Sequence, residues 1–358
     1  MRRTSVWVVL LTLVLLPGGA IGQGLGGTHT LTRLAEGVYS VEGIFQGANA
    51  AIIINEESVL VVDSHGSPAS AAALLEEVGK LTDRPVRYVV NTHWHADHQV
   101  GNQAYYRAFP GEVEFISHHF TREDIPTLGR QQLIDVRPFM EGPLNEARER
   151  LRSGLDNHGN PLTREQRRQI ERFVQGQADF LANLDEFEFV LPSLTFERSL
   201  ILHTRTRPIH VRYYHKGHTR GDVVVYLPEE KILVAGDLLT QPILWTWSSY
   251  PAEYIETLRA LERLDIERIV IGHGQVLNDK TYLVQSRQFL EAVVEHVRLS
   301  QASDASLDQT QESATEARSI QAFRRQFVGD TEQENAMFDQ MVTWTVERAH
   351  REATGDLE

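Results

Sequence analysis

The residues with the greatest capacity for chemistry lie between Asn91 and His98, where the sequence reads NTHWHADH. This stretch places His93, His95, Asp97 and His98 within six residues. Imidazole and carboxylate groups together suit zinc and similar divalent ions. The first two histidines can bind one ion from a single turn, and the Asp-His pair can hold a second. The spacing therefore predicts a metal centre rather than a plain polar turn.

Three further candidate ligands lie at the edges of short apolar segments. His218 comes just before such a segment, and Asp237 and His273 each follow one. Loops at the ends of strands place functional groups on a rigid sheet. Each of these signals is weak alone, because Gly-Asp and Gly-His-Gly often mark ordinary turns. In this order behind the first motif, they form a strong set.

The side chains that orient the ligands are harder to predict. A metal-bound histidine usually donates its second ring N–H to a carboxylate or a carbonyl group. Asp63 and Asp222 are the best candidates for this role, although either could instead cap a turn. Trp245 and Trp247 are compatible with a pocket wall and equally with core packing.

Together these motifs resemble those of the metallo-β-lactamase superfamily of metallohydrolases, over residues 31–352 approximately. The resemblance implies an α+β fold, a four-layer αββα sandwich with a helical insertion. It also implies that Asp237 bridges two ions, as in the glyoxalase II and lactonase branches. The remaining ligands divide by analogy into His93, His95 and His218 for the first ion, and Asp97, His98 and His273 for the second.

The function that the resemblance implies is that of a dinuclear zinc hydrolase, and the signal-peptide pattern described below adds export. A hydroxide bridging the ions would attack an ester, lactone, thioester or amide, and Asp97 would orient it as the catalytic residue. Two Zn²⁺ ions are expected, with iron or manganese as alternatives. Neither Gly-x-Ser-x-Gly nor any cysteine is present, so a serine or thiolate nucleophile is not expected. A class B-like β-lactamase, an iron-dependent oxidoreductase on the same fold and a non-catalytic metal-binding protein remain as alternatives.

The segment after Asp237 bears on the choice of substrate. Familiar β-lactamases of this superfamily carry cysteine in place of this aspartate, and often a lysine three residues later that holds the substrate carboxylate. Here that position is Thr240, and residues 238–242 include no base. Arg220 is the nearest cation in sequence that could substitute. Because an unpaired carboxylate is costly to desolvate in an apolar pocket, neutral acyl esters or lactones are favoured over β-lactams.

Residues 1–22 have the pattern of a secretory signal peptide. Arg2 and Arg3 precede an apolar run over residues 6–16, and Ala20-Ile21-Gly22 fits a small-x-small cleavage site. A membrane span needs about 20 apolar residues, so a stable anchor is not expected. The sequence thus predicts a periplasmic or secreted protein.

Composition limits the partners. The chain has 358 residues, of which 41% are hydrophobic, enough for a buried core. Without the two arginines of the predicted signal peptide, 33 basic residues stand against 49 acidic ones. This negative balance argues against a nucleic-acid partner and leaves a small-molecule substrate. With no cysteine, the chain has no disulfides, and its oligomeric state is not predicted.

Periodicity predicts the organisation along the chain. One metallo-β-lactamase-like domain is expected over residues 23–305, with a charged helical insertion at about 121–188. The insertion could be a helical pair on the surface of the sheet or a cap over the site. A polar link at 306–319 and a helix at about 331–353 make up the C-terminal part, 306–358. The expected early elements are strands at 30–34, 38–41, 50–54, 58–62 and 86–90 and a helix at 69–81.

Overall fold

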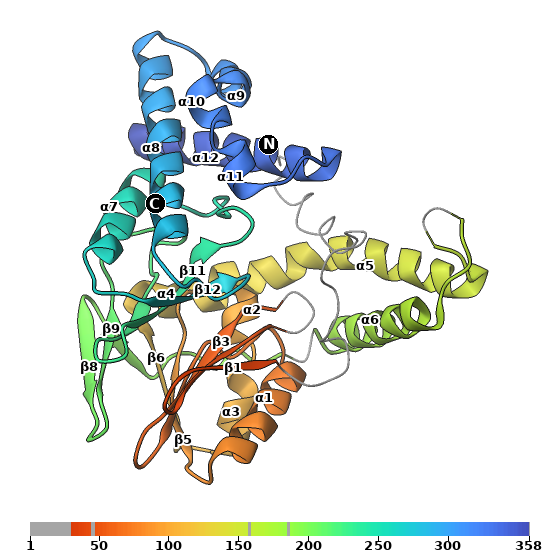
Figure 1. Cartoon of the computed structure of the whole chain (residues 1–358), viewed down its shortest axis with the longest axis vertical. Helices are drawn as coiled ribbons and strands as arrows, with labels where there is room; N and C mark the ends of the chain where they lie inside the picture. Colours follow the sequence, from red (N-terminus) through yellow and green to blue (C-terminus); the bar gives the residue numbers. More distant parts are fainter. Residues whose placement is uncertain (1–29, 44–46, 157–158, 185–186, 358) are drawn as a thin grey trace.

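The computed structural model describes residues 30–43, 47–156, 159–184 and 187–357. Two β-sheets pack face to face, and helices cover the outer face of each (Figure 1). This is the predicted αββα sandwich, so the predicted fold class is confirmed. The predicted signal peptide lies outside the described residues. No described helix combines the length and the apolar character that a membrane crossing requires.

The first sheet has seven strands in chain order, which begin antiparallel and become parallel from the fourth strand on. Its outer face is covered by α1 (Pro68–Leu81) and α3 (Asn102–Ala108), whose apolar side chains form one core layer with the strands. The predicted early strands and helix are confirmed to within one or two residues. The strands are β1 (Leu31–Ala35), β2 (Val38–Val41), β3 (Ala50–Ile54), β4 (Val59–Val62), β5 (Val86–Val90), β6 (Glu114–His118) and β7 (Leu194–Phe196).

The second sheet has five strands in the order β12-β11-β10-β9-β8. Its inner face meets the first sheet in a layer of valine, leucine and isoleucine side chains. Its outer face packs on α7 (Pro251–Glu262) and α8 (Thr281–Ala302). The strands are β8 (Ser199–His203), β9 (Pro208–Arg212), β10 (Val224–Leu227), β11 (Ile232–Thr240) and β12 (Arg268–His273).

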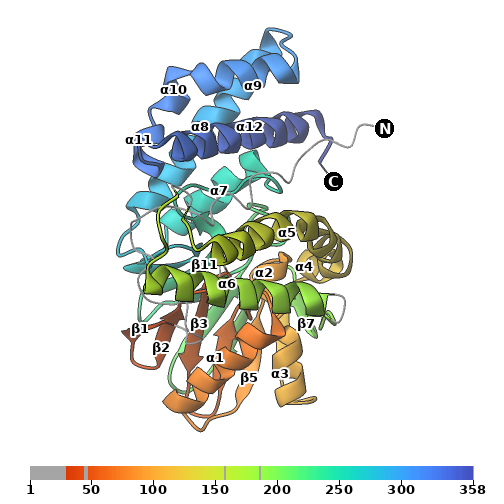
Figure 2. The same cartoon turned by 90° about the vertical axis from the view of Figure 1, so that its right-hand side faces the viewer.

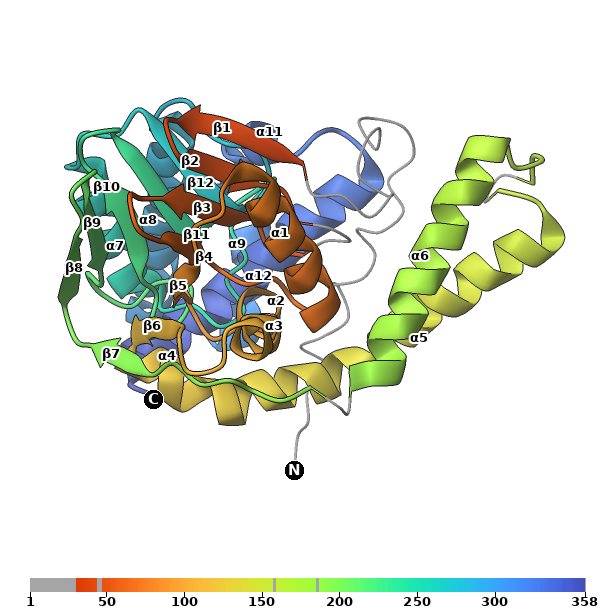
Figure 3. The same cartoon turned by 90° about the horizontal axis from the view of Figure 1, so that it is seen from below.

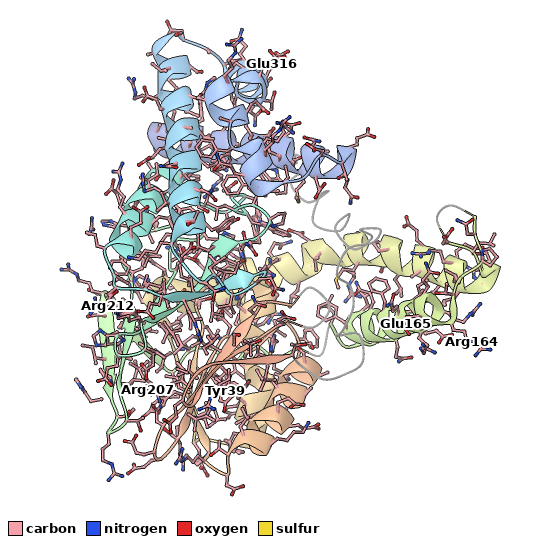
Figure 4. All side chains as sticks on the ribbon, viewed as in Figure 1. Tyr39, Arg164, Glu165, Arg207, Arg212 and Glu316 are labelled. Carbon is pink, nitrogen blue, oxygen red and sulfur yellow. The ribbon has the colours of Figure 1, made fainter. Side chains whose placement is uncertain are left out.

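The predicted insertion is confirmed as helical and connects β6 to β7. It consists of α4 (His119–Asp124), the π-helical turn η2 (Ile125–Gly129), α5 (Arg130–Ser153) and α6 (Arg164–Asn183). Helices α5 and α6 form an arm that projects from the sandwich (Figure 3). Arg164 and Glu165, in the first turn of α6, lie far out on this arm (Figure 4).

Among the described residues of the arm, those at its base contact the segment that carries the metal motif. Gln132 in α5 accepts a hydrogen bond from Ala96 N at 2.8 Å, and Leu133 packs on Val100 next to α2 (Ala96–Gln99). The described outer part of the arm points away from both this segment and the sheet (Figure 3). Neither alternative for the insertion describes the whole of it.

The expectation of a polar link at 306–319 is wrong. This segment forms α9 (Leu307–Glu316), which begins with a capping box between Ser306 and Gln309. Thr310 and Ala314 are buried on one face of the helix, and the polar residues occupy the other. The inner face of this helix packs on the C-terminal helix. The segment was not predicted to be helical because the residues of its outer face are polar.

The predicted C-terminal helix is confirmed as α12 (Glu332–Thr354). The short helices α10 (Arg318–Gln321) and α11 (Arg324–Phe327) connect α9 to it. Helices α8 to α12 stack beyond the second sheet (Figure 2), and their apolar side chains belong to the same buried cluster as those of α7 and β11. The C-terminal part is thus continuous with the core of the sandwich.

Candidate metal centre

The seven predicted ligands come together at one edge of the two sheets. The segment after β5 carries four of them, and the loop before β10 carries His218. Asp237 lies within β11, and His273 is the last residue of β12. Their ligand atoms form two compact groups, one of His93, His95, His218 and Asp237 and one of Asp97, His98 and His273. The division matches the one that the resemblance implies.

In the first group, three imidazoles and one carboxylate oxygen face one another. His218 Nε2 lies 3.0 Å from His95 Nδ1. Asp237 Oδ2 lies 3.4 Å from His218 Nε2 and 3.8 Å from His93 Nε2. All four side chains are buried, so this group is shielded from solvent.

In the second group, Asp97 Oδ2 lies 3.1 Å from His273 Nε2 and 3.6 Å from His98 Nε2. The other oxygen of Asp237, Oδ1, approaches His98 Nε2 at 3.2 Å and His273 Nε2 at 3.5 Å. The two oxygens of Asp237 therefore face different groups. This is the arrangement that a carboxylate bridging two ions requires.

The donor atoms fit divalent cations. His93 Nε2, His98 Nε2 and Asp237 Oδ1 are buried, and none has a hydrogen-bond partner among the described residues. Leaving a buried polar atom unpaired costs about 1–3 kcal/mol. His98 Nε2 and Asp237 Oδ1 attract each other at 3.2 Å in the metal-free protein, so the His93 nitrogen is the atom that most clearly indicates a missing partner. Nitrogen and oxygen donors of this kind suit zinc, iron or manganese.

The protonation of the histidines differs between the groups. Burial, with the neighbouring histidines, lowers the pKa of His93 and His95 well below the usual value, so both rings are neutral and offer a lone pair. Burial also opposes charge on His98, but the carboxylates of Asp237, Asp97 and Asp63 outweigh it and raise the pKa of this ring well above the usual value. In the metal-free protein, His98 therefore holds the proton that a cation would displace.

Asp63 lies behind the second group. It accepts hydrogen bonds from His98 Nδ1, Thr92 N and Thr92 Oγ1, each at 2.8 Å. A proton fixed on His98 Nδ1 leaves Nε2 directed at the second group. The structure thus places Asp63 where the sequence predicted a carboxylate that orients a ligand.

Asp222 differs from the expectation. It accepts hydrogen bonds from Thr219 N at 2.7 Å and Thr219 Oγ1 at 3.0 Å, and so caps the turn after His218. Within the described residues, it makes no hydrogen bond to a ligand histidine. The second nitrogen of His218 instead donates to the carbonyl oxygen of Trp245 at 2.7 Å. A backbone carbonyl therefore takes the role that was predicted for Asp222.

Two glycines allow Asp237 to occupy its position. A Cβ at Gly272 would lie 1.8 Å from Asp237 Oδ1. Gly236 has φ of +54°, and a Cβ there would lie 2.6 Å from Thr92 Oγ1. The Gly-Asp and Gly-His-Gly motifs thus supply the space for the bridging carboxylate as well as the ligands themselves.

Sequence reasoning missed the role of the segment Trp245–Ser249, here called the tryptophan loop. The Trp247 ring stacks on His95 with centroids 4.6 Å apart, and the Trp245 ring is parallel to His273 at 6.2 Å. Ser248 Oγ donates to the His218 carbonyl oxygen at 2.8 Å and lies 3.3 Å from His95 Nε2. It therefore accepts the His95 Nε2 proton and leaves Nδ1 for the first group. No feature of the local sequence signals this contact.

Other histidines lie near the motifs in sequence but belong to neither ligand group of the described residues: His65, His118, His119 and His215. Arg220 is the cation that was considered as a replacement for the lysine of other family members, and its guanidinium is paired with acidic side chains. Arg220 donates to Asp124 at 2.7 and 2.9 Å and to Glu123 at 3.2 Å. Its charge is therefore balanced by acids of the α4 segment.

Relatives in sequence include two kinds of enzyme. The chain is 24% identical over 235 residues to a linear primary-alkylsulfatase from a Pseudomonas species. The aligned region covers 63% of this chain and 41% of the relative. It is 30% identical over 95 residues to an atrochrysone carboxyl ACP thioesterase from Passalora fulva. That aligned region covers 26% of this chain and 27% of the relative. The chain thus spans less than half the length of the curated relatives it matches.

A solved structure and a family model agree with the geometry. A metallo-beta-lactamase from Pontibacter korlensis superimposes with a TM-score of 0.50 at 19% identity, covering 74% of this chain and 99% of that chain, and this likeness supports the fold alone. Residues 43–273 match the model of the metallo-beta-lactamase superfamily, a range that includes every predicted ligand. The chain belongs to the metallo-β-lactamase superfamily.

Proposed function

We propose that this protein is a dinuclear metal-dependent hydrolase, with zinc as its metal, that acts on a small ester, lactone or thioester. The observation that carries the proposal is the position of Asp237, whose two oxygens face the two ligand groups. When bound, two divalent ions would supply Lewis acidity and a water with a pKa of about 7. The buried and unpaired Nε2 of His93 supports this occupancy.

The exposure of the ligands gives the side from which a substrate would approach. The Asp97 and His273 side chains are 33% and 24% exposed, whereas the other ligands are buried. A carboxylate at this mouth can accept a hydrogen bond from an attacking water and orient it. Interactions of His98 and His273 outweigh burial and lower the pKa of Asp97 to about 2, so it is ionised at neutral pH. We assign this role to Asp97.

The surroundings of Thr240 disfavour a β-lactam substrate. Thr240 is buried, and its hydroxyl is occupied by Ile243 O at 2.8 Å and Trp245 N at 3.2 Å. Arg220 is paired with acids, so neither residue is available to hold a substrate carboxylate. Trp245 stacks on the partly exposed His273 and offers an apolar surface instead. We therefore rank neutral acyl substrates above penicillins and carbapenems.

A sulfate ester is the second candidate. The similarity to an alkylsulfatase extends over 63% of this chain, whereas the similarity to a thioesterase extends over 26%. Both reactions transfer a group to water, and the two ligand groups are compatible with either. The alternative of a β-lactamase is tested by the same experiment.

The experiment compares kcat/KM for an acyl lactone, an acyl thioester, a primary alkyl sulfate and a carbapenem on one zinc-loaded preparation. We expect two zinc ions per chain and turnover of a neutral acyl substrate. A chelator should abolish this turnover. Asp237→Asn should lose both. Zinc binding without turnover of any of these compounds would contradict the proposed activity. A carbapenem preferred by tenfold or more, about 1.4 kcal/mol of transition-state stabilisation, would support the β-lactamase alternative.

We further propose that the protein acts after export. The basic start and the short apolar run of residues 1–22 support this location. The proposed partner is a small-molecule substrate, because the acidic balance of the chain disfavours nucleic acid.

A further inference from the structure

Helix α12 lies outside the region that matches the superfamily, yet it holds the tryptophan loop. The hydroxyls of Thr345 and Thr246 lie 2.8 Å apart, and both residues are fully buried. One turn further along α12, Arg348 Nε donates to Ser249 O at 2.7 Å and its Nη2 donates to Ser248 O at 3.1 Å. The Thr246 hydroxyl also lies 3.4 Å from the carbonyl oxygen of Met341 in α12. Four side-chain hydrogen bonds thus connect this helix to a five-residue loop.

The same loop contacts ligands of both groups. Ser248 and Trp247 hold the ring of His95, and the Trp245 carbonyl oxygen fixes the tautomer of His218. The Trp245 ring stacks on His273. A displacement of the loop would therefore reach three of the seven ligand side chains at once.

The two ends of the loop are held differently. At its start, Trp245 N donates to Thr240 Oγ1, which belongs to β11 and therefore to the sheet. The middle and the end, from Thr246 to Ser249, are held by α12 through Thr345 and Arg348. Hydrogen bonds in such a buried setting are strong because water does not compete for them. The contacts with His95 come from the part of the loop that α12 holds.

From these contacts we infer that Thr345 and Arg348 are positioning residues for the metal centre. They fix the tryptophan loop so that His95 and His218 are already oriented before a cation binds, which raises the affinity of the first group. The inference rests on the proposed metal-binding function. It assigns to the C-terminal helix a role in the site, beyond its contribution to the core.

The test uses matched threonine variants on α12. Thr345→Val removes the hydroxyl that reaches Thr246 and keeps the shape of the side chain. Thr343→Val is the control, because Thr343 also donates to the carbonyl of the residue four positions earlier, at 2.9 Å, as Thr345 does at 2.7 Å. Of the two hydroxyls, that of Thr345 is the one bonded to the loop. Thr345→Ser retains the hydroxyl and should behave as the wild type.

A second pair tests the arginine. Arg348→Gln removes the guanidinium and with it the Nη2 donor to Ser248 O, and it leaves at most one amide donor near Ser249 O. Arg351→Gln is its control, because Arg351 donates to Asp356 O at 3.1 Å, away from the loop. The readout is zinc affinity by competition with a chromophoric chelator, which requires no substrate. Far-UV circular dichroism and the unfolding midpoint of the metal-free protein establish that each variant is folded.

Loss of a residue that orients a ligand typically weakens metal binding by about 10–100-fold. Because Thr345 and Arg348 act through the loop, we expect about a tenfold loss at one of the two sites for Thr345→Val and Arg348→Gln. Thr343→Val, Arg351→Gln and Thr345→Ser should remain within about twofold of the wild type.

The outcomes separate the inference from the function on which it rests. A folded wild type that binds no zinc would contradict the proposed function. Two zinc ions in the wild type, with folded Thr345→Val and Arg348→Gln both within twofold of its affinity, would overturn the positioning role. An equal loss in Thr345→Val and Thr343→Val would also overturn it, because the effect would then come from the helix as a whole. If Thr345→Val does not fold, Arg348→Gln and its control decide.

Discussion

Replacing Gly272 by alanine should disable the metal centre with the addition of one methyl group. The Cβ would lie 1.8 Å from Asp237 Oδ1, whereas real Cβ contacts essentially never fall below 3.0 Å. The carboxylate oxygen or β12 would therefore have to shift by about 1.2 Å, the difference between these two distances. Metal and catalytic sites tolerate displacements of only about 0.5 Å.

The oxygen that must move is the one that faces His98 and His273. We therefore expect Gly272→Ala to lower zinc affinity in the second group by about 100-fold or more, equivalent to about 2.8 kcal/mol. The assay is chelator competition together with elemental analysis of the dialysed protein, which should retain one zinc ion or none.

Gly79→Ala is the matched control. Gly79 lies inside α1, and a Cβ there would meet no atom within 4 Å. Alanine should leave zinc binding unchanged and stabilise the fold by about 1 kcal/mol, because glycine weakens a helix interior by that amount. Two zinc ions bound to Gly272→Ala with wild-type affinity would refute the steric reasoning.

Four further predictions concern the site and the chain terminus. Asp63→Asn should weaken zinc binding at the second group by about 10–100-fold, measured by chelator competition; an unchanged affinity would show that His98 does not depend on Asp63. Asp97→Asn should lower kcat by about 10²–10⁴-fold on the best substrate, and unchanged turnover would mean that the catalytic role is misassigned. Because acidic neighbours raise the pKa of His98, zinc binding should release a proton and weaken as pH falls; calorimetry in buffers of different ionisation enthalpy measures this, and no buffer dependence would contradict it. Mass spectrometry of the exported protein should place its N-terminus near Gln23, and an intact Met1 would argue against cleavage.

The clustering of the candidate ligands was predictable because its information is local. Four ligands lie within six residues, and Asp237 and His273 each follow the apolar run of a strand, Asp237 within β11 and His273 at the end of β12. Parallel strands end at the same edge of a sheet, as β11 and β12 do, so the strand pattern brings their side chains together. The same reasoning located Asp63, which follows β4 next to β5.

The partners of the ligands were less predictable because they depend on how loops cross. Asp222 and the Trp245 carbonyl were both available to His218, and the path of the loop decided between them. Ser248 reaches His95 from 153 positions away in the chain. Helix α9 was missed for another reason. Its buried residues are Thr310 and Ala314, and so few buried positions give no apolar periodicity that could be recognised in a polar segment.

The continuity of the apolar core has a consequence for how far the protein can be shortened. One buried cluster extends from β11 and α7 through α8 to Met341, Val342 and Val346 of α12. The superfamily similarity ends at residue 273, before α8 begins. A recombinant fragment cut at that point would leave the outer face of the second sheet and α7 bare to water, and large bare apolar surfaces promote aggregation. The limit of sequence similarity is therefore not a limit of autonomous folding.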